Sequence, residues 1–309
     1  MREGRRMVGV SRRLRDAGLE MMLLVVVLAM GCGQTSSGPR SGPLRVVAAE
    51  NMWGSIAAQV GGSHVQVTSL INSPSADPHD YEATPADGRA VAGADYFLSN
   101  GLGYDAWAAK LAGANKSSRR LDASVQQILG LSDGENPHRW YAPGDVLKVV
   151  DRIAADYQQL DPANAAAYEQ QRTAFASTAL QQYTEVATQI RQRYADTAVA
   201  ATESIAAPLV AALGLRLLTP DSFLNAVSEG NDPSARDVTT FNAQIASKQI
   251  KLLLFNTQNA TPDVHRLVDA AKAQGIPVVG LTETPDPPEQ RFQDWQTAQL
   301  QEIAKALAR

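Results

Sequence analysis

Two of the four histidines lie in the same local setting, and they are the residues best suited to bind a metal ion. They occur in Asp77-Pro78-His79-Asp80-Tyr81 and in Asn136-Pro137-His138-Arg139-Trp140. Because proline fixes its own φ and keeps the preceding residue extended, each histidine should leave a stiff loop in a defined direction. A neutral imidazole held in this way is a good metal ligand. A histidine after proline is also a common packed turn residue, so carboxylates are needed to complete a site.

Two glutamates supply the carboxylates that such a site would need. Glu203 and Glu283 each follow a short apolar stretch with strand character, and each lies between two hydroxyl residues. In parallel α/β sheets, ligands bind where the strands end, so both side chains should face the ligand-binding crevice. Two neutral imidazoles and two carboxylates would balance a divalent cation, whose uncompensated charge is costly away from water. A lone glutamate after a strand is more often a cap or a surface residue, so the signal lies in the combination.

The segments that must position these residues alternate between strands and helices. The expected strands are 44–49, 65–71, 96–98, 198–201, 215–218, 250–255 and 277–281. This alternation predicts an α/β fold with two doubly wound lobes, 44–161 and 195–309, each built on a parallel sheet that helices cover on both faces. The polar stretch 116–135 is expected to be an irregular connection that leads to His138.

The segment between the lobes predicts a long helix. Residues 162–194 are rich in Ala, Gln and Glu and contain no glycine and no proline after Pro162. At 1.5 Å per residue this gives a single helix of roughly 45–50 Å. A sustained heptad pattern, which a coiled coil would need, is absent from the sequence. We therefore expect a rigid strut that joins the two lobes.

Composition narrows the class of protein. The chain has 309 residues, of which 44% are apolar and 19% charged, and a formal net charge of −4. These values are typical of a globular protein of about two domains. Without a basic stretch in its body and with few aromatic residues, the chain is not expected to bind nucleic acid. Its only cysteine, Cys32, excludes an intrachain disulfide and a cysteine-based zinc site.

The N-terminal residues 1–32 are typical of an export signal. An arginine-rich start precedes the apolar run Met21–Met30, which is too short to remain as a membrane span and ends close to Cys32. The pattern predicts a lipoprotein signal, with Cys32 as the lipidated first residue of the mature protein. Residues 33–43 would then be a flexible tether that holds the protein outside the cytoplasm at the membrane surface. A plain secretory signal with an incidental cysteine is the alternative.

With these motifs in place, the chain resembles the metal-binding lipoproteins of bacterial ABC importers for zinc and manganese. The resemblance runs from Leu44 to the C-terminus and rests on both Pro-His motifs, on Asp161-Pro162 and Tyr168, and on Thr202-Glu203 and Thr282-Glu283. It implies two α/β lobes joined by one rigid helix, with one divalent transition metal, zinc or manganese, in the cleft between them. It also implies a monomer that delivers the ion to the membrane subunits of an ABC permease.

Matching motif by motif, the resemblance implies the ligands His79, His138, Glu203 and Glu283. Glu203 falls on the family's third ligand, which is His in many zinc proteins and Glu in many manganese proteins. Glu283 falls where the family usually has aspartate, which leaves Asp286 as a weaker candidate for the fourth ligand. We expect the ligands to line a wet cleft in the metal-free protein, so that truncating any of them would leave the fold nearly intact.

The resemblance leaves the ion open between zinc and manganese. The histidine-rich loop of many zinc-specific members is absent from the first lobe. Two histidines with two carboxylates form a hard ligand set that suits manganese, whereas the general affinity order favours zinc.

Two other classes of protein compete with a metal-binding transport component. A secreted metal-dependent hydrolase would need an open coordination position and a general base, but four ligands would close the site, and no His-Glu-x-x-His pattern occurs. A surface adhesin with a structural metal is the third class, and nothing in the sequence favours it. We therefore expect a binding protein and not an enzyme.

Overall fold

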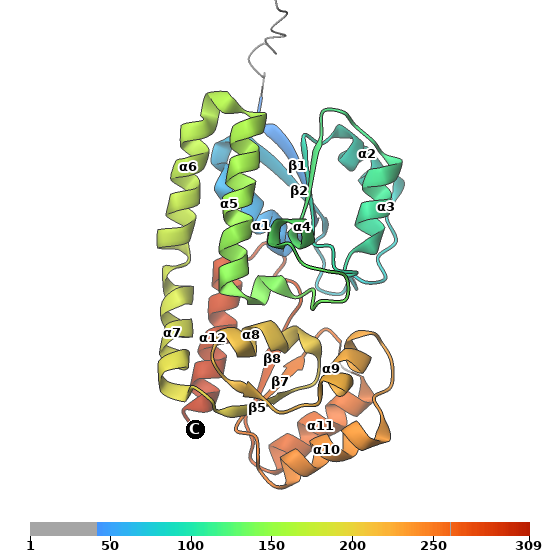
Figure 1. Cartoon of the computed structure of the whole chain (residues 1–309), viewed down its shortest axis with the longest axis vertical. Coiled ribbons are helices and arrows are strands. Elements are labelled where there is room, and N and C mark those ends of the chain that lie inside the picture. The colour runs from blue at the N-terminus through green and yellow to red at the C-terminus, as the bar shows by residue number, and fades with distance from the viewer. Residues whose placement is uncertain (1–41, 260) are drawn as a thin grey trace, which may run out of the picture. The chain divides into compact units, whose positions relative to one another are not determined.

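The computed structural model describes residues 42–259 and 261–309, which contain two four-stranded sheets (Figure 1). The predicted signal segment 1–32, with Cys32, lies outside the described residues, as does the predicted tether apart from residues 42 and 43. Among the described residues, no helix is both long enough and apolar enough to cross a membrane.

The sheet of the first lobe has the strand order β2-β1-β3-β4, and its neighbouring strands are all parallel. Its strands are β1 (Leu44–Glu50), β2 (Val65–Ile71), β3 (Tyr96–Ser99) and β4 (Leu121–Ser124). The helices of this lobe are α1 (Asn51–Gly61), α2 (Pro85–Gly93), α3 (Ala106–Ala114), α4 (Val125–Leu129) and α5 (Pro143–Leu160). The helix α2 begins as its sequence predicts, because Thr84 and Asp87 form a capping box around Pro85.

Both faces of this sheet are buried, because successive side chains of a strand point to opposite sides. Val46 packs in one hydrophobic cluster with Trp53 of α1 and Val149 of α5. Its neighbour Val47 packs in another cluster, with Val91 of α2 and side chains of α3. This confirms the predicted doubly wound arrangement.

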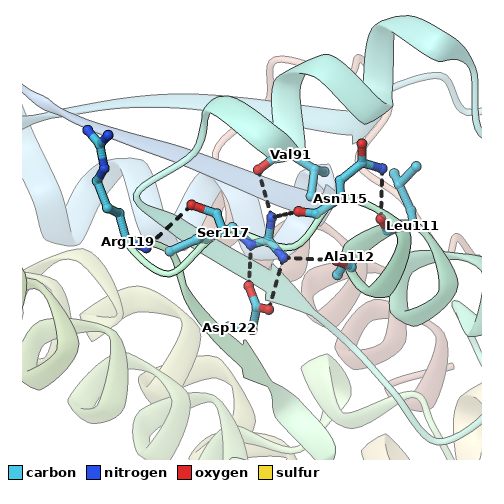
Figure 2. Close-up of polar contacts among 8 residues, drawn as sticks. Val91, Leu111, Ala112, Asn115, Ser117, Arg119 and Asp122 are labelled. Carbon is cyan, nitrogen blue, oxygen red and sulfur yellow. Dashed lines mark hydrogen bonds and ion pairs between the residues drawn. The ribbon is translucent and has the colours of Figure 1, made fainter.

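The strand β4 was not expected, because the polar sequence of 116–135 predicts an irregular connection. Arg120, just before β4, explains how a polar segment can be ordered there. Its buried guanidinium donates to the carbonyl oxygens of Val91 (2.9 Å), Asn115 (2.7 Å) and Ala112 (3.1 Å), and it pairs with the Asp122 carboxylate. Figure 2 shows the acceptors from α2, from α3 and the residue after it, and from β4 around one guanidinium group. Arginine has the donors to satisfy several carbonyl groups at once.

The second lobe repeats the design, with the strand order β6-β5-β7-β8 and parallel pairing throughout. Its strands are β5 (Ala198–Ala201), β6 (Arg216–Leu217), β7 (Leu253–Asn256) and β8 (Val278–Leu281). Its helices are α8 (Ala207–Ala212), α9 (Asp221–Ser228), α10 (Ala235–Ala246), α11 (Pro262–Ala273) and α12 (Phe292–Leu307). Val199 packs in the same cluster as Ile303 of α12, and Ala200 packs in the cluster of Phe223 of α9 and Phe241 of α10.

The segment 162–194 is not the single uninterrupted α-helix that its composition predicts. It begins with a 3-10 turn (Pro162–Asn164), which is followed by α6 (Ala165–Ala174), a π-helical stretch (Phe175–Ala179) and α7 (Gln181–Tyr194). The Leu180 amide donates to the Phe175 carbonyl oxygen five residues earlier, at 3.0 Å. Phe175 and Leu180 are both buried, and a spacing of five does not keep two side chains on one face of an α-helix. The π turn absorbs the extra residue and turns both inward.

Candidate metal-binding site

The first histidine lies in a loop between β2 and α2 whose geometry follows from its sequence. Asp77 Oδ1 accepts a hydrogen bond from the His79 amide at 2.8 Å and so closes a turn around Pro78. The carbonyl oxygen of Pro78 accepts a hydrogen bond from Trp107 Nε1 at 3.0 Å, which ties the loop to α3. The loop is therefore held by hydrogen bonds at both Pro78 and His79, and His79 itself is exposed.

The second histidine is held by the same kind of turn, with asparagine in place of aspartate. Asn136 Oδ1 accepts a hydrogen bond from the His138 amide at 2.9 Å and also lies 2.9 Å from His138 Nδ1. Since an amide oxygen can only accept, Nδ1 carries the hydrogen and Nε2 keeps its lone pair. That Nε2 is buried and has no hydrogen-bond partner. Burial, together with the nearby His79, lowers the pKa of His138 to about 3, so the ring is neutral at physiological pH.

The two glutamates follow β5 and β8 and are joined by one asparagine, Asn256. Its Nδ2 donates to Glu203 Oε2 at 2.9 Å and to Glu283 Oε1 at 2.6 Å. The other oxygen of Glu283 accepts a hydrogen bond from the Tyr104 hydroxyl at 3.0 Å. Burial and the charge of Glu283 raise the pKa of Glu203 to about 8, and burial also raises the pKa of Glu283. Two carboxyls in this position favour a proton or a cation beside them.

The structure brings three of the four candidate ligands into one cluster. Ligand atoms of His79, His138 and Glu283 all lie within 4.8 Å of one another. Glu203 is outside that cluster and is connected to it through Asn256. Asp286 is exposed and is also outside the cluster.

Of the four residues expected to line a wet cleft, only His79 is exposed. His138 is fully buried, and Glu203 and Glu283 are 1% and 6% exposed. The reason is that the two lobes are in contact around the site. Truncating the buried ligands would therefore leave a cavity or an unpaired group, contrary to the expectation from sequence.

Besides the bond from Tyr104 to Glu283, further hydrogen bonds cross between the lobes beside the cluster. Asn136 Nδ2 donates to the Ser204 carbonyl oxygen at 2.8 Å, and the Tyr141 hydroxyl donates to the Thr282 carbonyl oxygen at 2.8 Å. Gln258 Nε2 donates to the carbonyl oxygen of Pro74, in the loop that carries His79, at 2.9 Å. Each pair involves a loop that carries a candidate ligand or lies beside one, so lobe contact and ligand position are coupled.

Three residues around the cluster were missed from sequence. The ring of Tyr104 lies 4.8 Å from His79 and 5.9 Å from His138, measured between ring centroids. Asn256 ends β7, and Gln258 accepts hydrogen bonds from the amides of Glu283 (2.6 Å) and Thr284 (3.1 Å). Because ligands bind where the strands of a parallel sheet end, Asn256 could have been predicted if amide side chains at strand ends had been considered as well as carboxylates.

Residues 46–306 match the family model described as ZnuA, the periplasmic component A of a zinc-uptake complex. The chain belongs to the ZnuA family. The ZnuA-family chain is 29% identical over 155 residues to the manganese-binding lipoprotein MntA of Halalkalibacterium halodurans, a match that covers 47% of this chain and 50% of the relative. It is 25% identical over 270 residues to MntA of Bacillus subtilis, a match that covers 85% of this chain and 87% of the relative.

The fold of this ZnuA-family chain is also found in a solved structure. The manganese-bound periplasmic metal binding protein of Candidatus Liberibacter asiaticus superposes with a TM-score of 0.69 at 21% identity. The match covers 85% of this chain and 98% of that one. At this identity the likeness establishes the two-lobed α/β fold.

Proposed function

We propose that this protein captures a divalent transition metal, zinc or manganese, outside the cytoplasm and delivers it to the membrane subunits of an ABC permease. The observation that carries the proposal is the buried, unpartnered Nε2 of His138 beside His79 and Glu283. A neutral imidazole with a free lone pair next to carboxyls of raised pKa is a ligand set prepared for a cation. The relatives' names as manganese-binding lipoproteins support the same function.

The proposed ligands are His79 and His138 from the first lobe, 44–161, and Glu203 and Glu283 from the second, 195–309. Glu203 would join the cluster through a change of its side-chain rotamer or through closer approach of the lobes. The segment 162–194 between these domains would set their separation. Transport fits a set of ligands from both lobes, because opening the lobes would separate the ligands and release the ion.

The ligand set can be tested by titrating the purified protein with zinc and with manganese after elemental analysis of protein prepared without chelator. We expect one ion per chain. Glu283→Ala should abolish tight binding, and the matched control Asp286→Ala should bind as the unmodified protein does. Loss of binding in Asp286→Ala alone would move the fourth ligand to Asp286. Protein that bound neither ion would overturn the proposed function.

We further propose that Cys32 is the lipidated first residue of a mature, monomeric protein and anchors it to the membrane. The support is the position of the only cysteine at the end of the apolar run, together with the relatives' names as lipoproteins. Mass spectrometry of the membrane-extracted protein should show an N-terminal lipidated Cys32. An unmodified N-terminus at another residue would refute the anchor and leave the metal site unaffected.

A further inference from the structure

The residue between the two glutamates is placed there by the topology of the sheet. In the order β6-β5-β7-β8, the strand β7 lies between β5, which leads to Glu203, and β8, which leads to Glu283 (Figure 1). Asn256 is the last residue of β7 and is fully buried. Its side chain therefore lies between the two carboxylates at the edge of the sheet where the strands end.

The orientation of the Asn256 amide is fixed by a neighbour. Asn256 Oδ1 accepts a hydrogen bond from the Gln258 amide at 2.9 Å. The amino group consequently faces the other way, toward Glu203 Oε2 (2.9 Å) and Glu283 Oε1 (2.6 Å). One uncharged amino group thus holds one oxygen of each carboxylate.

These bonds restrict how the glutamates can bind an ion. Both oxygens of Glu283 already accept a hydrogen bond, one from Asn256 and one from Tyr104. Glu203 Oε2 accepts from Asn256 and, at 3.4 Å, from Asn259. Bidentate binding by either glutamate would place the ion on the oxygen that also accepts from Asn256, so that the ion and the hydrogen bond share the lone pairs of that oxygen. Binding through the other oxygen alone leaves the Asn256 hydrogen bond undisturbed.

We propose that Asn256 is a positioning residue that restrains both glutamates to one oxygen each and thereby favours zinc over manganese. Two imidazoles and two single carboxylate oxygens make the four-coordinate set typical of zinc. Manganese binds oxygen-rich sites of higher coordination, which bidentate glutamates would provide. This inference rests on the proposed function, since it concerns the ion bound at the same site.

The test is a competition titration with zinc and manganese on the full chain and on Asn256→Ala. We expect the ratio of zinc to manganese affinity to fall by about tenfold or more in the variant, the scale on which residues behind metal ligands act. X-ray absorption at the zinc edge should show four ligands in the unmodified protein and more in the variant. Asn242→Ala is the matched control, because it removes an exposed asparagine of α10 that makes no hydrogen bond with either glutamate; its ratio should stay within about twofold of the unmodified protein.

Asn256→Ser provides a second variant in case alanine unfolds the protein. Because a serine hydroxyl can donate to only one carboxylate, we expect a ratio of zinc to manganese affinity between those of the unmodified protein and Asn256→Ala. Equal losses of zinc and manganese affinity in either folded variant would overturn the inference and leave the proposed function standing. Affinities for both ions that stay as in the unmodified protein would also overturn the inference. Unmodified protein that bound neither ion would refute both.

Discussion

His79 is exposed, whereas His138, Glu203 and Glu283 are buried, and this difference decides what each substitution can show. Replacing a buried ligand changes both the metal site and the packing of the fold. Replacing His79 changes the site alone, because its side chain fills no cavity. The sequence identifies both histidines through their Pro-His motifs, but it cannot show that one is buried, since burial depends on how the second lobe packs against the first.

His79→Ala should therefore separate ligand binding from stability. We expect metal affinity to fall by more than about a hundredfold, beyond what the loss of a residue behind a ligand costs. The metal-free protein should unfold within about 0.5 kcal/mol of the unmodified protein, as for other exposed positions. The control is His265→Ala, which removes another exposed histidine. Calorimetric titration and thermal unfolding measure both quantities, and unchanged affinity in His79→Ala would remove it from the site.

The raised pKa of Glu203 predicts how metal binding depends on pH. Because the carboxyl holds a proton up to a pKa of about 8, an ion that binds there must displace it. For one displaced proton, the apparent affinity should rise about tenfold per pH unit between roughly pH 6 and 7.5 and level off above about 8. His138, with its pKa lowered to about 3, should add nothing in this range. Affinity that did not change between these pH values would contradict the assignment of Glu203.

Glu203 also determines whether the stability of the metal-free protein rises or falls with pH. Its pKa is raised from 4.5 on folding, so the folded state binds more protons than the unfolded state between 4.5 and about 8. Glu203 therefore contributes stability that is lost as the pH rises through this window. Glu203→Gln should flatten that part of the stability curve.

At the scale of elements, the strands are the part that the sequence predicts best. Short apolar runs such as Val46-Val47 and Leu253-Leu254 are buried on both faces, and the strand of the second run ends at Asn256, beside the site. The polar strand β4 could not be predicted, because its order depends on the contacts of Arg120 with α2 and α3. The π turn was missed although its signal is present in the sequence, in the five-residue spacing of Phe175 and Leu180.

Single-residue deletions test this interpretation of the π turn. Removing exposed Thr178 should convert the stretch to regular α-helix with Phe175 and Leu180 four residues apart, and the protein should keep its thermal stability. Removing exposed Gln189 from regular α7 instead rotates the register before buried Ile190 and should cost roughly 2–5 kcal/mol, as losing a core side chain does. A Thr178 deletion as damaging as the Gln189 deletion would refute the interpretation.

At the scale of the whole 42–309 region, the lobes share one hydrophobic cluster and several hydrogen bonds at the site. An ion bound by residues of both lobes should therefore stabilise them together. At a free-ion concentration of 100 times Kd, mass action adds about 2.7 kcal/mol. For a protein of this size we expect the melting temperature to rise by roughly 5–10 °C in one transition. A shift in only one of two separate transitions would place the ion within a single lobe.

In the proposed complex, one ion is bound by two imidazoles from the first lobe and two carboxylates from the second. X-ray absorption spectroscopy of the protein loaded with one equivalent of zinc tests it most directly, because scattering from imidazole rings distinguishes histidine from other light-atom ligands. We expect a shell of four nitrogen and oxygen atoms at about 2.0–2.2 Å with two imidazoles, and one imidazole in His79→Ala. A spectrum without imidazole scattering, or with two imidazoles that persist in His79→Ala, would contradict it.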